Sequence, residues 1–117
     1  MIRFKRAQRV GGEVQKELSD LLLKEIRDPR LHAVTIMHVN ITDDLRSARV
    51  FFSTSEGQEQ KGEALAGFKS ASGYLRRELS QRLELRYMPA LEFFYDEGFE
   101  RATRLNKVLK SVIELDE

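Results

Sequence analysis

Two groups of basic side chains give this sequence its clearest chemistry. The first lies at the N-terminus, where no acidic residue precedes Glu13, and consists of Arg3, Lys5, Arg6 and Arg9. The second lies between residues 69 and 86, with only two acidic residues among its members, and consists of Lys69, Arg76, Arg77, Arg82 and Arg86. Clustered cations favour a phosphate-rich partner, although any one cluster can equally serve to solvate a helix.

Residues that could support catalysis or bind a metal are few. The sequence has no cysteine, and its two histidines, His32 and His38, have no further ligands at a zinc-binding spacing. Asp43 and Asp44 lie in a polar segment, where carboxylates are typical of turns. A Walker-type loop, a GxGxxG segment and a GxSxG elbow are all missing. We therefore predict a non-enzymatic binding protein with no metal site and no cofactor.

A long helix is expected to carry the N-terminal cations. Apolar residues recur at spacings of three and four from residue 4 to residue 26. Gly11 and Gly12 interrupt this pattern, so the helix is expected to fray there or to begin properly only after Gly12. Asp28 and Pro29 should end it, because proline disfavours helical geometry in the residue before it.

After the first helix, the spacing of apolar residues predicts three strands and two further helical regions. Residues 34–41 and 48–53 read as strands, and their short Asp-rich connection favours an antiparallel hairpin. Residues 53–62 read as a polar loop, and residues 91–95 as a third strand. Helical spacing returns over residues 63–83 and from residue 99 to the C-terminus. Ala71, Ser72 and Gly73 are expected to kink the first of these helices or split it in two.

The length and composition are those of one domain, predicted to span residues 1–117. The chain has 117 residues, of which 41% are hydrophobic and 33% charged. The predicted order is helix, strand, strand, two helices meeting at a kink, strand and C-terminal helix, an α+β fold with a three-stranded sheet packed on helices. No apolar stretch approaches the length of a membrane span, and the lack of cysteine fits a reducing compartment, so a cytoplasmic location is expected.

Four passages, in order along the chain, resemble the ribosome-binding factor A family. They are EIRDPRL at residues 25–31 leading into VTI at 34–36, DL at 44–45 with ARV at 48–50, ASGYLR at 71–76, and PALEF at 89–93 with Asp96 and RLN at 104–106. The resemblance covers about residues 2–113. It implies a type II KH-like fold, which has the element order inferred above from the residue pattern.

The resemblance also implies a function and a partner. In ordinary KH domains a GxxG loop clamps about four nucleotides, and this family carries an Ala-x-Gly kink instead, matched by Ala71, Ser72 and Gly73. The family binds the immature small ribosomal subunit and its ribosomal RNA (rRNA), assists late maturation and processing of the rRNA 5′ end, and is linked to growth in the cold. We accordingly expect a monomer that binds neither DNA nor membranes.

The predicted RNA-binding set combines the two basic groups with the kink segment. Its members are Arg3, Lys5, Arg6, Arg9, Lys69, Ser70, Ala71, Ser72, Gly73, Tyr74, Arg76, Arg77, Arg82 and Arg86. Tyr74 could stack on a base or belong to the core, and Phe51 and Phe94 could form a stacking platform or be buried. Two other functions remain open: a protein–protein adaptor whose basic groups serve only solubility, and a small nuclease.

Overall fold

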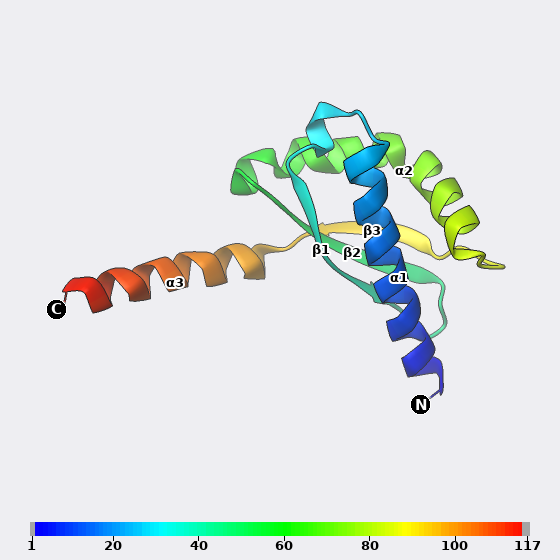
Figure 1. Ribbon diagram of the computed structural model, residues 1–117, viewed down its shortest axis with the longest axis horizontal. Coiled ribbons are helices and arrows are strands. Elements are labelled where there is room, and N and C mark those ends of the chain that lie inside the picture. Colours follow the sequence, from blue (N-terminus) through cyan, green and yellow to red (C-terminus); the bar gives the residue numbers. More distant parts are fainter. Residues whose placement is uncertain (1, 116–117) are drawn as a thin grey trace.

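The computed structural model describes the backbone of residues 2–115 and the side chains of residues 5–98, 101–102 and 104–112. It contains α1 (Ile2–Lys24), β1 (Val34–Ile41), β2 (Ser47–Thr54), α2 (Lys61–Leu83), β3 (Ala90–Tyr95) and α3 (Glu97–Leu115) (Figure 1). Short 3₁₀ helices, η1 (Pro29–Leu31) and η2 (Gly57–Gln60), precede β1 and α2. The predicted α+β class and element order are confirmed, but the predicted loop over residues 53–62 is partly wrong, because it contains η2 and the end of β2.

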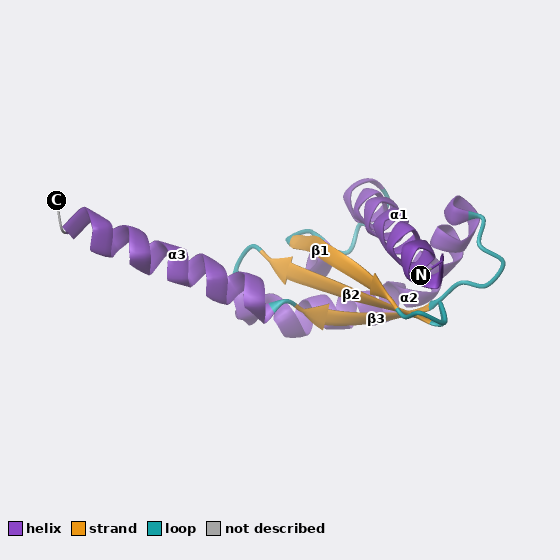
Figure 2. Cartoon of the chain, turned by 90° about the horizontal axis from the view of Figure 1, so that it is seen from below, coloured by secondary structure: helices purple, strands orange, loops and turns teal. Residues whose placement is uncertain are grey.

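The sheet has the order β1-β2-β3, with β2 antiparallel to β1 and parallel to β3. The predicted hairpin is therefore confirmed. In Figure 2 the three strands are seen with α2 behind them. Strand alternation places Phe52, Phe93 and Tyr95 toward α2, where Phe52 and Phe93 contact Phe68 with ring centroids 5.1 and 4.1 Å away. The core accordingly lies between the sheet and the helices.

The other face of the sheet carries a row of three aromatic rings, one from each strand. The ring of Phe51 stacks on His38 of β1 at 4.4 Å and on Phe94 of β3 at 5.5 Å. Phe94 is 41% exposed and Phe51 is half-buried. Because the rings stack on one another, each covers part of its neighbour's flat surface, and a role of Phe51 and Phe94 as a stacking platform for bases stays a prediction.

Helix α1 runs without interruption through Gly11 and Gly12, so the expectation that it begins after Gly12 is wrong. Gly11 is buried where α1 crosses the edge of β1, and a Cβ at this position would lie 2.8 Å from the carbonyl oxygen of Val39. Nearby, the Gln15 side chain donates a hydrogen bond to the Met37 carbonyl over 3.1 Å. The first glycine thus allows α1 to cover the open edge of the sheet.

We expect the two glycines to respond oppositely to alanine. Gly11→Ala should lower the free energy of unfolding by about 1–3 kcal/mol, because the added methyl group meets a backbone oxygen that cannot move freely. Gly12 is exposed, and a Cβ there would meet nothing within 4 Å. Gly12→Ala should therefore stabilise the protein by about 0.5–1 kcal/mol. Urea unfolding of both variants tests this, and equal shifts would show that α1 does not approach β1 this closely.

Helix α2 is one helix from Lys61 to Leu83, and its second half runs in a different direction from its first half (Figure 1). The predicted kink is thus a bend within a continuous helix, and the alternative of two separate helices is wrong. Figure 1 also shows α3 extending away from the rest of the molecule. Among its described residues, four large apolar side chains are 49–58% exposed: Leu105, Val108, Leu109 and Val112.

Candidate RNA-binding surface

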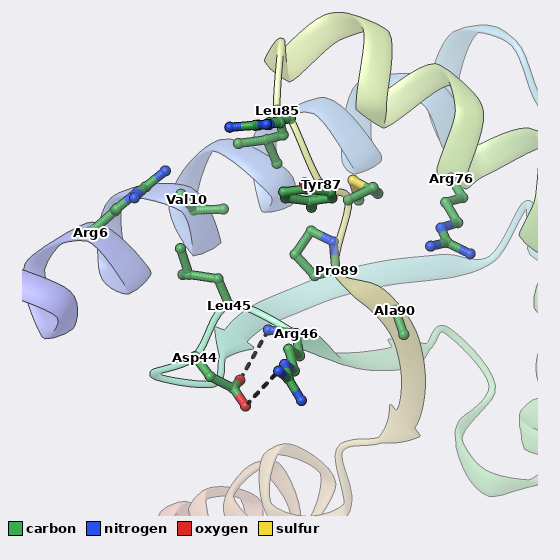
Figure 3. A pocket seen from close by; sticks show the side chains of 12 residues that line it. Arg6, Val10, Asp44, Leu45, Arg46, Arg76, Leu85, Tyr87, Pro89 and Ala90 are labelled. Atoms are coloured by element: carbon green, nitrogen blue, oxygen red, sulfur yellow. Dashed lines mark hydrogen bonds and ion pairs between the residues drawn. The ribbon is translucent and has the colours of Figure 1, made fainter.

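A pocket of about 620 Å³ lies where the first half of α1, the β1–β2 turn and the loop before β3 meet (Figure 3). Arginines from four separate parts of the chain line it: Arg6, Arg46, Arg76 and Arg86. Its remaining walls are mostly apolar and are formed by Val10, Leu45, Leu85, Tyr87, Met88, Pro89 and Ala90. We call this hollow the arginine pocket. Its size is typical of small-ligand sites.

The β1–β2 turn forms one wall of the arginine pocket. Asp44 accepts hydrogen bonds from the Thr42 hydroxyl over 2.7 Å and from the Arg46 backbone N–H over 3.0 Å, which holds the pKa of Asp44 below its usual value. This confirms a turn role for Asp44. Leu45 adopts φ 61°, a left-handed conformation that costs a leucine about 1–2 kcal/mol. The turn therefore holds an apolar side chain at the pocket against its backbone preference.

The loop before β3 forms the opposite wall and is tied to the same turn. The Ala90 N–H donates to the Arg46 carbonyl over 2.8 Å, joining the start of β3 to the β1–β2 turn. Pro89 is buried, whereas Tyr87 is 76% exposed. The Arg86 guanidinium lies over the Tyr87 ring, and the Arg86 Cζ atom is 5.4 Å from the ring centroid. The loop thus presents an exposed aromatic ring next to a cation.

The charges of the arginine pocket are largely uncompensated. Asp44 is the one carboxylate among the lining residues, and it lies 4.0 Å from the Arg46 guanidinium, with both side chains mostly exposed. Within the described part of the chain, Arg6, Arg76 and Arg86 have no carboxylate within ion-pair distance. An exposed arginine with no internal partner remains available to an anion from another molecule.

Arg82 is in a different environment from the other predicted arginines. Its guanidinium lies 3.1 Å from Glu17, 3.0 Å from Asp20 and 2.7 Å from Glu25, all on or just after α1. The Tyr74 hydroxyl donates to the same Glu25 carboxylate over 2.7 Å, which raises the pKa of Tyr74. These contacts hold the second half of α2 against α1. An RNA phosphate would have to compete with three carboxylates for Arg82.

This network predicts a pH-dependent contribution of Arg82 to stability. Hydrogen bonds from Lys24 and Arg82 lower the pKa of Asp20 in the folded protein. A carboxyl group whose pKa is lower in the folded protein than in the unfolded chain stabilises the fold when the pH is above its unfolded pKa of about 4. This stabilisation is lost as the pH falls through the pKa of the folded protein. We expect Arg82→Gln to lower the urea midpoint of unfolding at pH 7. The urea midpoints of the variant and the parent protein should converge as the pH is lowered toward 2.

The matched control for Arg82→Gln is Arg77→Gln. Arg77 is exposed on the same helix and has no carboxylate within ion-pair distance among the described residues. Its replacement should leave the urea midpoint nearly unchanged at every pH. If the urea midpoints of Arg82→Gln and the parent protein differed by the same amount from pH 7 to pH 2, Asp20 would not mediate the effect.

The Ala-x-Gly segment lies within α2, outside the lining of the arginine pocket. Gly73 is exposed, its φ is not positive, and a Cβ there would meet nothing within 4 Å. Lys69 and Ser70 are also exposed, and the Ser70 hydroxyl accepts a hydrogen bond of 3.4 Å from Arg30. No contact within the described part of the protein therefore explains a glycine at position 73, and a bare backbone is presented to the outside.

The structure thus divides the predicted RNA-binding set. It brings Arg6, Arg76 and Arg86 to one pocket, while Lys5, Arg9 and Arg77 are exposed elsewhere on their helices. The side chain of Arg3 lies outside the described residues. Sequence reasoning missed Arg46 and Tyr87. The pair Arg86-Tyr87, an aromatic residue beside a cation just before Met88-Pro89, is the signal that could have revealed Tyr87.

In the described part of the chain, no group of three or more His, Asp or Glu side chains is placed to hold a metal ion. None of the helices in the described residues combines the length and apolar character that crossing a membrane requires.

Comparisons with solved structures identify the fold. The crystal structure of ribosome-binding factor A from Thermus thermophilus matches with a TM-score of 0.66 and 24% identity, over 76% of this chain and 94% of that one. A homology model of the Thermus thermophilus factor, fitted into a cryo-electron microscopy map of its 30S complex, also matches. Its TM-score is 0.54 and its identity 27%, and the match covers 70% of this chain and 90% of that one. The predicted KH-like fold is confirmed by these similarities.

Sequence comparisons identify the family. Ribosome-binding factor A from Syntrophobacter fumaroxidans is 42% identical over 113 residues, covering 95% of this chain and 97% of the relative. The factor from Desulfatibacillum aliphaticivorans is 43% identical over 111 residues, covering 95% and 90%. The family model described as ribosome-binding factor A matches residues 6–109, which include every lining residue of the arginine pocket. The chain therefore belongs to the ribosome-binding factor A family.

Proposed function

We propose that this protein is a non-enzymatic ribosome biogenesis factor that binds the immature small ribosomal subunit through its rRNA. It then assists late maturation, including processing of the rRNA 5′ end, and supports growth in the cold. The observation that carries the proposal is that Arg6, Arg76 and Arg86 line one pocket and have no carboxylate within ion-pair distance among the described residues. Family membership and the related factor in a 30S complex support the choice of partner.

The proposal includes the setting in which the protein acts. It works in the cytoplasm as a monomeric domain spanning residues 1–117, with no DNA or membrane partner, no cofactor and no catalytic residue. The arginine pocket and the Gly73 segment are its two RNA contacts, and Lys5, Arg9, Lys69 and Arg77 add positive charge around them. Arg82 and Tyr74 rank lower in this set because they already have carboxylate partners.

Co-sedimentation with isolated small and large ribosomal subunits, at low and moderate salt, tests this function. Selective binding to the small subunit that weakens with salt is expected, because each phosphate contact releases counterions. Equal binding to both subunits, or no binding, would contradict the proposal. Selective binding that hardly changes with salt would favour the protein–protein adaptor, whose apolar interface depends little on ionic strength.

The bare backbone at Gly73 predicts a separation of stability from binding. Gly73→Ala should raise the free energy of unfolding by about 0.5–1 kcal/mol, because alanine is the better helix former and nothing obstructs its methyl group. It should nonetheless weaken association with the small subunit, because the methyl group keeps the RNA from the backbone. Thermal unfolding and co-sedimentation measure the two effects.

Gly62→Ala is the control for Gly73→Ala. Gly62 lies in the same helix, is exposed, and has equally open surroundings. Its replacement should stabilise the fold to a similar degree and leave subunit binding unchanged. If Gly73→Ala also left binding unchanged, the Gly73 segment would not be an RNA contact.

A further inference from the structure

The arginine pocket has the shape and chemistry to hold a flat, partly apolar group. Its volume of about 620 Å³ lies within the range of small-ligand sites, and most of its lining residues carry no charge. Val10 and Leu45 come from one side of the pocket and Pro89 from the other (Figure 3). A site that bound only phosphates would need the cations but not these apolar walls.

Tyr87 adds an aromatic surface to these walls. Its ring lies in the middle of the lining side chains in Figure 3, yet 76% of the residue is exposed. Exposing a large ring is unfavourable in the free protein. Arg86 lies over the ring at 5.4 Å, as cations commonly do beside aromatic groups that stack on bases. Tyr87 is therefore placed to stack on a flat group that enters the pocket.

The positions of the cations fit a chain of phosphates better than a single one. Arg6 projects from α1 and Arg76 from α2, and Figure 3 shows them on opposite sides of the pocket. A nucleic acid strand carries a phosphate on each side of every nucleotide, so a strand that crosses the pocket can meet cations on both sides.

We propose that the arginine pocket receives one unpaired base of a single-stranded RNA segment, which stacks on Tyr87 while neighbouring phosphates contact Arg6, Arg76 and Arg86. The inference rests on the proposed function and specifies what one of its two RNA contacts binds. The segment is single-stranded because bases within a duplex are stacked on one another and cannot enter a side pocket. Sequence preference is weak, since every base has a flat aromatic face.

The test is an NMR titration of the full chain with short RNAs. The probes are a pentauridylate, a pentaadenylate, a pentauridylate whose central nucleotide is abasic, and a ten-base-pair RNA duplex. The abasic probe keeps all the phosphates and lacks only the base in question. We expect both intact single strands to shift the backbone signals of residues 85–90, and the abasic probe to bind about fivefold or more weakly.

Variants at Tyr87 separate stacking from charge and from folding. Tyr87→Phe keeps the ring and should bind the intact strands as the parent protein does. Tyr87→Leu keeps an apolar side chain without the ring and should weaken binding about fivefold or more, with an unchanged melting temperature. It should also lose the preference for the intact strand over the abasic one.

Four results would each overturn the inference: no pocket shifts with any single strand, equal binding of intact and abasic probes, equal binding of the duplex, or parent-like binding by folded Tyr87→Leu. Co-sedimentation of the parent protein with the small subunit distinguishes this failure from that of the proposed function. If subunit binding persists while the pocket ignores single strands, the function stands and the assigned ligand is wrong. If the parent protein does not bind the small subunit either, both the proposed function and the assigned ligand are wrong.

Discussion

Replacement of Phe52 by alanine is expected to lower the free energy of unfolding by about 3–5 kcal/mol. Phe52 lies on the central strand, is fully buried, and packs edge-on against Phe68 of α2 and Tyr95 of β3, with ring centroids 5.1 and 5.8 Å away. Its removal would leave a cavity where the sheet meets α2. For a domain whose whole stability is about 5–15 kcal/mol, such a loss leaves little margin.

Phe51→Ala is the matched control, because it removes the same side chain one residue away on the opposite face of β2. Phe51 is only half-buried, and its side chain stacks on His38 and Phe94. We expect its replacement to lower the free energy of unfolding by about 1–2 kcal/mol. Urea unfolding monitored by circular dichroism gives both values. Equal costs for Phe51→Ala and Phe52→Ala would mean that the sheet is covered on both faces.

Combined replacement of Arg6, Arg76 and Arg86 by glutamine is expected to weaken small-subunit association at least about tenfold at moderate salt. The three cations come from different elements but line one pocket, and the described residues place no carboxylate within ion-pair distance of them. If each meets one phosphate, the slope of log affinity against log salt should fall in magnitude by about two to three. Stability should change little, because the three side chains are exposed.

The control for this triple variant removes the same charge elsewhere. Arg27, Arg49 and Arg104 are exposed and lie outside the predicted RNA-binding set and the arginine pocket. Their joint replacement by glutamine lowers the net charge by the same amount, so it should reproduce any effect of net charge alone. Equal losses of association in the two triple variants would show that the arginine pocket has no special role.

Local sequence patterns were sufficient to predict the elements of the fold. The strand predicted over residues 34–41 agrees with β1, and the pattern over residues 91–95 lies within β3, because alternation and turn residues act over a few positions. Gly11 shows where this reasoning fails. Helix propensity counts a glycine as a weakness, but its role here depends on the approach of β1, which lies far along the chain.

The candidate site was harder to predict for the same reason. The sequence shows that residues 69–86 are basic, but not which arginines find a partner within the protein. Arg82 faces three carboxylates because of the way α2 packs on α1. Arg76 lines the pocket instead because a separation of six residues is about 1.7 helical turns, which places the two side chains roughly 120° apart around α2. Tyr74 reaches Glu25 through the same packing. Charge counts alone cannot distinguish these outcomes.

A chain that is still being synthesised cannot yet form the arginine pocket. The pocket wall after residue 84 leads directly into β3, which pairs in parallel with β2 and follows the whole of α2 along the chain. A nascent or truncated chain that ends before Pro89 carries most of the cations without the surface that arranges them. Under the proposed function, such incomplete chains would compete poorly for ribosomal particles, and the order of synthesis would reserve tight binding for the finished molecule.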